Sequence, residues 1–435
     1  MRKLELHWQI LIAIILAGIA GTIIFSYRES TGLEPTILTI PYISIFDYIG
    51  TIFLNALRMI IVPLIMSSII VGVAGIGSGG NLGSLSGKTI LFYATTTLAA
   101  ILVGLLVINA IGPGYDGNGD PVGDQLALSA DTAELEASVA GKGPGDVAKV
   151  FQRMVPPNIV AAAVEGQMLG IIFFAILFGF FMTKLSHEYA DPLFKFWDGM
   201  FHVMMKMTEW IMTFAPIGVF GLVGAVIAEA GLKATGPLAV FSISVLLALA
   251  IHAFVTLPLL LRFVGRVDPI KTLIGASKPM LTAFSTASSS ATLPVTIKSV
   301  EENIGVSNKI SSFVLPLGAT VNMNGTALYE CCAAIFIAQA YGLDLTFGVQ
   351  FSIVVIALMT SIGVAGVPSA SLVAIAIILT AIGLPIEALG VLMVFDRILD
   401  MARTSVNIWG DCTAATIVAR LEGEETNVAL QPSHN

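Results

Sequence analysis

Two polar stretches interrupt the apolar second half of this chain: TASSSATLP at Thr286–Pro294 and TSIGVAGVPSAS at Thr360–Ser371. Both are too rich in small polar residues for a helix that faces lipid. Non-helical backbone at membrane depth is tolerated only where it is buried in protein or lines an aqueous cavity. We therefore expect two half-helices to meet at each stretch as a re-entrant hairpin. For either segment alone, a helix-packing face lined by small residues is the alternative.

The overall composition places these stretches in a membrane. Of the 435 residues, 56% are hydrophobic and 11% are charged, and the mean hydropathy is +0.90. Globular soluble chains carry about 25% charged residues, so a soluble enzyme is excluded. Apolar runs long enough to cross roughly 30 Å of hydrocarbon lie at His7–Phe25, Ile45–Ile76, Ile90–Ile111, Met168–Met182 and Leu238–Leu261. We predict an all-α polytopic membrane protein whose first run, which has no cleavage site, stays as a helix.

The charges between the apolar runs predict an orientation. Basic residues flank alternate span ends, at Arg2, Lys3, Lys88, Lys184, Lys195, Arg262, Arg266 and Lys271. Because lysine and arginine accumulate on the cytoplasmic side, we place these ends, both termini and the tail 422–435 in the cytoplasm, with the protein in the plasma (cell inner) membrane. Residues 112–149 are acidic and rich in glycine, which predicts a mobile extracytoplasmic loop.

Each predicted hairpin is followed by a helix with its own polar motif. NMNGT at Asn322–Thr326 follows the first, and DMARTSVN at Asp400–Asn407 follows the second. A hairpin and a helix that occur twice predict an internal repeat, a common feature of transporter folds.

The last span, FDRILDMARTSVNIWGD at Phe395–Asp411, carries five charges. Its polar residues recur at spacings of four, three, four and four, which puts them on one helix face. They are Asp396, Asp400, Arg403, Asn407 and Asp411, with Arg397 at the margin. An ionisable side chain at mid-bilayer costs at least about 2.5–3.5 kcal/mol on insertion scales. Several in one span indicate ligands or partners in an interior cavity; the alternative is a buried structural ion pair between Asp400 and Arg403.

In these motifs the chain resembles the dicarboxylate/amino acid:cation symporter family, the glutamate transporter homologues. The similar stretches occur in family order and cover nearly the whole chain. They are FLNALRMIIVPLIMSSIIVGVA at Phe53–Ala74, APIGVF at Ala215–Phe220, SSSATLPVT at Ser288–Thr296, LPLGATVNMNGTALYE at Leu315–Glu330, VAGVP at Val364–Pro368 and the span at Asp396–Asp411. The resemblance implies a glutamate-transporter-like fold with inverted repeats, eight transmembrane helices and two re-entrant hairpins, assembled in the lipid bilayer as a homotrimer.

The same resemblance implies a division between static and moving parts. Residues 1–265 form mainly the scaffold and trimerisation helices, although the third and sixth spans belong with the moving part. Residues 266–421, in the order hairpin, helix, hairpin, helix, form the transport core, which carries substrate across the membrane as an elevator.

The resemblance also implies an acidic amino acid substrate. Arg403 holds the side-chain carboxylate, a task that suits a planar guanidinium, and Asp400 takes the α-amino group. These residues lie about 4.5 Å apart along the helix axis, which fits aspartate or glutamate. The family pattern adds Ser288, Ser289, Thr326, Gly366, Val367, Thr404 and Asn407 to the substrate site.

Sodium, co-transported with the substrate, needs hard oxygen ligands, and the resemblance implies two sites for it. The first uses Gly318, Asn322, Asn407 and Asp411; the second uses backbone at Thr320, Ser361, Ile362 and Val364. A third family site draws on Tyr93, Thr96, Thr97, Asn322 and an aspartate, but Asn324 stands where that aspartate belongs. We expect sodium to bind there weakly or not at all.

Glu330 matches the glutamate that carries a proton in the family's proton-coupled members, a role that suits a mid-membrane carboxylate. The alternative is a glutamate that is hydrogen-bonded for structure. Many relatives carry an arginine where this chain has Ala287 or Met401, and Arg397 is a candidate to supply that charge. Ser371 and Trp409 are also unusual.

Other functions have specific arguments against them. Arg403 argues against a symporter for neutral amino acids, and Asp400 against one for C4-dicarboxylates. An intramembrane hydrolase is a remote alternative, because Asp400 and Asp411 lie about three turns apart on one helix and the histidines do not accompany a Gly-x-Ser-x-Gly turn. Nucleic acid is not an expected partner. Aspartate and glutamate are not distinguished, since one methylene is worth about 1–3 kcal/mol.

Overall fold

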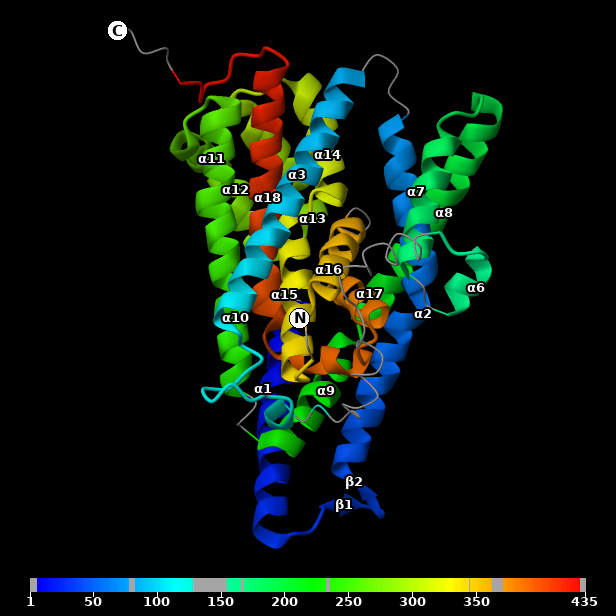
Figure 1. Cartoon of the computed structure of the whole chain (residues 1–435), viewed down its shortest axis with the longest axis vertical. Helices are drawn as coiled ribbons and strands as arrows, with labels where there is room; N and C mark the ends of the chain where they lie inside the picture. The colour runs from blue at the N-terminus through cyan, green and yellow to red at the C-terminus, as the bar shows by residue number, and fades with distance from the viewer. Residues whose placement is uncertain are drawn as a thin grey trace, which may run out of the picture.

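The computed structural model describes residues 6–77, 83–126, 128, 155–165, 168–231, 235–343, 345–361 and 371–430. In these residues the chain is mostly helical and forms an elongated bundle (Figure 1). The strands among them form one two-stranded antiparallel sheet, β1 (Thr36–Ile37) with β2 (Ile40–Pro41), at one end of the bundle. The described part of the chain is therefore mostly helical, as predicted, and departs from the all-α class in this short sheet.

Most of the described residues in the first half of the chain are helical. The bounds of these helices are α1 Leu6–Thr31, α2 Tyr42–Gly77, α3 Gly83–Ile111, α6 Ile159–Val164, α7 Met168–Met182, α8 His187–Met212, α9 Ala215–Ala230 and α10 Thr235–Ile251. From α10 the chain continues through a π-helical turn at His252–Thr256, α11 (Leu257–Leu260) and a second π-helical turn at Leu261–Gly265. Within the described residues, Trp8–Thr31, Gly87–Ile111 and Thr235–Gly265 are long and apolar enough to cross a membrane.

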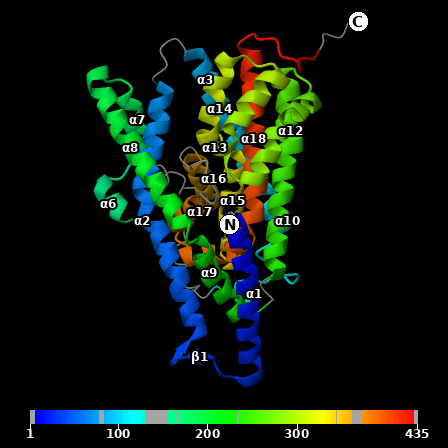
Figure 2. The same ribbon diagram turned by 180° about the vertical axis from the view of Figure 1, so that it is seen from behind.

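Helices α1, α2, α7, α8 and α9 form one group, in which α2 packs against α7, α8 and α9 (Figures 1 and 2). The helix α9 packs against both α1 and α2, and glycine permits the close approach: a methyl group on Gly21 would lie 2.8 Å from Ile227 Cβ. In contrast, α3 packs chiefly against α10 and against α15 (Asn324–Ala340). Helices α3 and α10 thus lie with the second half of the chain.

At the first polar stretch, Thr286–Pro294, the chain turns between two helices. Helices α12 (Pro269–Thr286) and α13 (Ser289–Ser299) pack against each other and meet at Ala287 and Ser288. Ala287 has a left-handed backbone with φ of 49°, which ends α12, and the Ser288 hydroxyl accepts a hydrogen bond from Ala291 N (3.2 Å) and so caps α13. A π-helical turn at Val300–Ile304 follows.

The helix predicted around NMNGT is broken. Helix α14 (Asn308–Val321) ends before Asn322, and α15 begins at Asn324. Helices α16 (Phe347–Thr360) and α17 (Ser371–Ile382), which flank the second polar stretch, pack against each other; residues 362–370, where the tip of the second hairpin is predicted, lie outside the described residues.

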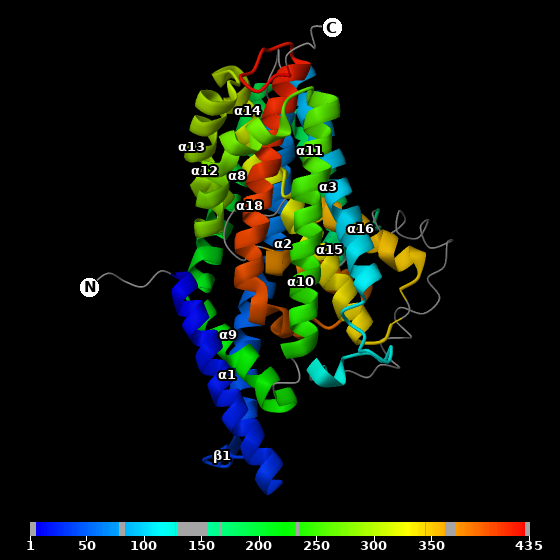
Figure 3. The same ribbon diagram turned by 90° about the vertical axis from the view of Figure 1, so that its left-hand side faces the viewer.

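Helix α18 (Leu389–Leu421) is continuous. It runs through the interior between α12 and α10 (Figure 3) and also packs against α14 and α15. The predicted loop at 112–149 is described only up to residue 126 and at residue 128; its first part forms a bridge between Tyr115 and Pro121 and a short 3-10 turn at Asp124–Leu126.

Candidate functional site

The polar face of α18 is buried. Asp396 is 4% exposed, Asp400 6%, Arg403 0%, Asn407 3% and Asp411 1%. Helices α10, α12, α14 and α15 pack around α18 and cover this face. A buried charge without a partner would be very costly at such positions. The partners of each charged side chain therefore define what the site can bind.

Arg403 is held between two carboxylates. Its Nη1 donates to Asp396 Oδ1 (3.1 Å), and its Nη2 donates to Asp400 Oδ1 (2.9 Å). Its Cζ lies 3.8 Å from the centroid of the Tyr329 ring, a cation–π contact. The structural pairing of Asp400 with Arg403, one of the alternatives drawn from the sequence, is thus present. Among the described residues, Arg403 Nε has no acceptor.

Asn407 and Thr326 meet at the break between α14 and α15. The Asn407 Oδ1 accepts hydrogen bonds from Gly325 N (2.8 Å) and Thr326 N (3.3 Å), while its Nδ2 donates to Thr326 Oγ1 (3.0 Å). The first amides of a helix have no partner within it, and here a side chain from α18 caps α15 in place of a local residue. Gly325 permits this approach, since a Cβ there would lie 2.6 Å from the Arg403 carbonyl oxygen.

The other predicted substrate residues are only partly placed. Ser288 and Ser289 are buried at the start of α13, which packs against α18. The Thr404 hydroxyl donates to the Asp400 carbonyl (2.8 Å) on its own helix. Gly366 and Val367 lie outside the described residues. Helix N-termini such as that of α13 favour carboxylates, so the placed residues suit a ligand with an acidic group.

The residues of the first predicted sodium site lie together. Asn322 Nδ2 donates to Asp411 Oδ1 (2.8 Å), and Gly318 lies so close that a Cβ there would be 2.4 Å from the same oxygen. The carbonyl-rich break after α14 and the Asp411 carboxylate are hard oxygen donors. Of the second site, the structure places the backbone of Thr320 in α14 and Ser361 at the end of α16; Ile362 and Val364 lie outside the described residues.

In the third predicted site, Tyr93, Thr96 and Asn324 have partners within the protein. The Tyr93 hydroxyl donates to the Val314 carbonyl (2.7 Å), the Thr96 hydroxyl donates to the Phe92 carbonyl (2.8 Å), and Thr97 is buried nearby on α3. Asn324 Nδ2 lies 3.4 Å from His252 Nε2.

The structure gives an account of Trp409 as well. Its Nε1 donates to the Ala253 carbonyl (2.9 Å) in the first π-helical turn, so the fully buried indole fixes α18 against that turn. Nothing in the structure explains Ser371, which is buried at the start of α17.

Glu330 is fully buried on α15. The Thr360 hydroxyl, at the end of α16, donates to Glu330 Oε2 (3.0 Å), and among the described residues Oε1 has no partner. The contact joins α15 to α16. It is compatible both with a proton-carrying glutamate and with the structural alternative.

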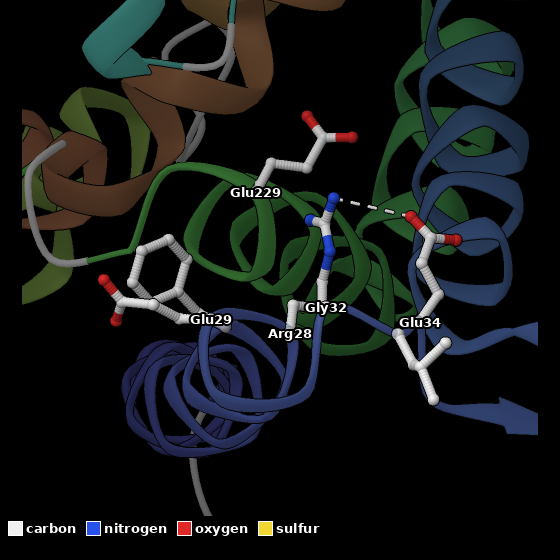
Figure 4. A pocket seen from close by; sticks show the side chains of 7 residues that line it. Arg28, Glu29, Gly32, Glu34 and Glu229 are labelled. Atoms are coloured by element: carbon white, nitrogen blue, oxygen red, sulfur yellow. Dashed lines mark ion pairs between the residues drawn. The ribbon is translucent and has the colours of Figure 1, made fainter.

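A separate cavity of about 480 Å³ lies where α1 and α9 end. Figure 4 shows Glu34 and Glu229 on either side of the Arg28 guanidinium, whose Nη2 lies 3.4 Å from Glu34 Oε1. Glu29 also lines it. The lining carries three glutamates and one arginine, and this net negative charge disfavours an acidic ligand, so the α18 face is the better candidate.

The sequence reasoning missed three side chains of the site and one pairing. Asp396 is placed on the polar face but is not identified as a partner of Arg403, although seven residues are two helical turns and bring both to one face. The three side chains are Tyr329, whose ring lies under Arg403, Thr360, which donates to Glu330, and His252, which lies next to Asn324. Each comes from a different helical segment than the residue it contacts or lies far from it in the sequence, so no spacing in the sequence identifies it.

Comparison with known proteins gives a consistent result. The model of the sodium:dicarboxylate symporter family matches residues 6–421. The chain is 36% identical over 428 residues to a proton/sodium-glutamate symport protein of Geobacillus stearothermophilus, covering 98% of this chain and 96% of the relative. It is 35% identical to the proton/glutamate-aspartate symporter of Escherichia coli (97% and 93% covered) and 33% identical to excitatory amino acid transporter 3 of Mus musculus (98% and 87% covered).

Proposed function

Because this chain belongs to the sodium:dicarboxylate symporter family, we propose that it takes up an acidic amino acid, aspartate or glutamate, driven by sodium. It is a membrane transporter and not an enzyme. The observation that carries the substrate class is the fully buried Arg403, hydrogen-bonded to two aspartates on its own helix. Such an arrangement supplies both a cationic and an anionic partner for an amino dicarboxylate.

In the proposed complex, the substrate exchanges partners with the ion pairs on α18. Its ammonium group takes the carboxylate of Asp400, and its side-chain carboxylate takes the Arg403 donors that this frees. Asp396 stays with Arg403, so the guanidinium is never without a counter-charge. The α-carboxylate is held at the start of α13 by Ser288 and Ser289, and by Thr326, Thr404, Asn407 and the backbone of Gly366 and Val367.

For the ions, we propose that the Asp411 carboxylate, Asn322, Asn407 and Gly318 hold one sodium ion. Backbone at Thr320, Ser361, Ile362 and Val364 holds a second. The contact between Asp411 and Asn322 supports the first assignment. Asn324 supplies no charge, so the third family position, with Tyr93, Thr96 and Thr97, binds sodium weakly or not at all, and Glu330 carries a proton in its place.

For the architecture, we propose the family's trimer and elevator, with eight membrane-spanning helices and two re-entrant hairpins. Residues 266–421, with α3 and α10, move as the transport core against a scaffold of α1, α2 and the α7–α9 region. The packing of α3 against α15 and of α10 against α18 supports this division. Both termini face the cytoplasm of the plasma (cell inner) membrane.

Uptake by liposomes that contain only the purified protein tests the function. We expect an inward sodium gradient to drive accumulation of labelled L-aspartate or L-glutamate above equilibrium, and potassium or choline in place of external sodium to abolish it. A competition panel then distinguishes the alternatives. Stronger competition by L-serine or L-alanine than by L-aspartate would identify a neutral amino acid carrier, and stronger competition by succinate a C4-dicarboxylate carrier.

A further inference from the structure

A second guanidinium lies beside the proposed substrate site. Arg397 is on α18, one turn before Asp400, and its side chain is 9% exposed. With Asp396 it lines a small gap whose other side is formed by apolar residues of α1 and α9, among them Ile10 and Val219. Apolar neighbours do not offset the free-energy cost of burying a charge. The question is therefore which groups stabilise the buried Arg397 guanidinium.

The pairing of Arg397 is incomplete. Its Nη1 lies 3.8 Å from Asp400 Oδ2, which is an ion pair but too long for a hydrogen bond. Among the described residues its Nε has no acceptor. Arg403, in comparison, makes two charge-assisted hydrogen bonds. Of the two guanidiniums, Arg397 therefore has more donor capacity left for a ligand.

The spacing on the helix places both guanidiniums around one carboxylate. Arg397 precedes Asp400 by three residues and Arg403 follows it by three, so each reaches Asp400 from one side. When a ligand ammonium group takes Asp400, both guanidiniums lose this partner. Arg403 keeps Asp396, whereas Arg397 has no second ion pair among the described residues.

We propose that Arg397 is a specificity-determining residue that binds the side-chain carboxylate of the substrate together with Arg403. That carboxylate takes the position between the guanidiniums that Asp400 has in this structure. A ligand with an amide in its place leaves Arg397 buried without a counter-charge, so Arg397 selects acidic over neutral amino acids. This inference rests on the proposed function and names a second residue for it.

The test compares L-aspartate with L-asparagine, which differ in the distal carboxylate and are similar in shape. Both are used as competitors of labelled L-aspartate in proteoliposomes with wild type, Arg397→Gln and Arg397→Lys. Arg420→Gln is the matched control, because Arg420 is on the same helix but in its last turn, where it donates to the Glu424 carbonyl.

We expect Arg397→Gln to raise the half-inhibitory concentration of aspartate about tenfold to 150-fold, the range of a hydrogen bond to a charged group. The half-inhibitory concentration of asparagine should change less than threefold. For aspartate, Arg397→Lys should have a half-inhibitory concentration between those of the wild type and Arg397→Gln. Lysine keeps the charge, so this variant remains informative if the glutamine variant does not fold. Arg420→Gln should match the wild type.

An equal loss for aspartate and asparagine would overturn the inference, because it is the signature of a structural role for Arg397. An unchanged aspartate value in Arg397→Gln would overturn it as well. Failure of the proposed function is seen separately, in the wild type, as absence of sodium-driven aspartate uptake; that result would overturn both.

Discussion

At the scale of single residues, the chain places charges where the membrane makes them expensive and pairs them along one helix. Four charges, those of Asp396, Arg397, Asp400 and Arg403, sum to zero on the first turns of the polar face of α18. These four side chains are electrically balanced as a group, and in the proposed complex a ligand enters by exchanging partners with them. Removal of one charge breaks the balance, which gives each substitution here a defined consequence.

Arg403 is the first such test. Arg403→Cys leaves Asp396 and Asp400 buried without their guanidinium. Truncation of one partner in a buried charge pair costs about 2–5 kcal/mol, so we expect acidic amino acid transport to fall at least about thirtyfold and a small neutral amino acid to be accepted instead. Uptake of labelled aspartate and serine in proteoliposomes measures both. Undiminished aspartate uptake by the variant would remove the acidic-substrate assignment.

Asp411 tests the sodium site. Asp411→Asn removes a charge but keeps an oxygen next to Asn322 and Gly318. Because the amide neutralises no part of the ion's charge, the sodium concentration for half-maximal aspartate binding should rise about tenfold or more. The variant should still fold, as checked by its elution from a sizing column. The same sodium dependence as in the wild type would contradict this assignment.

Glu330 and Asn324 together test which ions drive transport. We expect an inward proton gradient to stimulate sodium-dependent uptake in the wild type and to have no effect in Glu330→Gln. Asn324→Asp should restore a charged ligand beside Asn322 and make uptake depend more steeply on sodium. Vesicles in which the sodium and pH gradients are imposed independently provide the measurement. If the wild type ignores the pH gradient and Glu330→Gln transports normally, Glu330 has only the structural hydrogen bond to Thr360.

At the scale of helices, the break between α14 and α15 is fixed by α18. Gly325 lies against the Arg403 backbone, and Gly325→Ala would bring a Cβ to 2.6 Å from the Arg403 carbonyl oxygen. Overpacking of this kind costs about 1–3 kcal/mol, so we expect earlier thermal unfolding and weaker aspartate binding. Gly87→Ala on α3 is the matched control, since a Cβ there meets nothing within 4 Å. Equal melting temperatures of Gly325→Ala and Gly87→Ala would contradict the tight contact between Gly325 and the Arg403 backbone.

Much of this architecture could be predicted from the sequence, because periodicity and interruption are local signals. The stretch at Thr286–Pro294 predicts the turn between α12 and α13, and the polar spacing in α18 predicts its buried face; the structure confirms both. The continuity of a helix through NMNGT could not be judged locally, because Asn407 of α18 caps the amides that the break exposes. The contact of Glu330 with Thr360 likewise depends on how α16 packs against α15.

At the scale of the whole molecule, the proposed elevator requires α18 to slide past α9. Ile10 of α1, Val219 of α9 and Met393 of α18 line one gap, so they offer a cross-linking test with an internal control. A bridge between Val219→Cys and Met393→Cys joins the proposed scaffold to the proposed core, and we expect it to stop uptake and leave aspartate binding intact. A bridge between Ile10→Cys and Val219→Cys lies within the scaffold and should leave uptake unchanged. Full transport by the first pair, once cross-linked, would contradict the elevator.

The central claim is that the buried face of α18 holds an acidic amino acid and sodium at the same time. Binding of L-aspartate to the purified wild type over a series of sodium concentrations, and of sodium over a series of aspartate concentrations, tests it most directly. Linkage requires each ligand to strengthen the other by the same factor. We predict a mutual strengthening that Arg403→Cys and Asp411→Asn both weaken. Aspartate binding of equal strength in sodium and in choline would contradict the account.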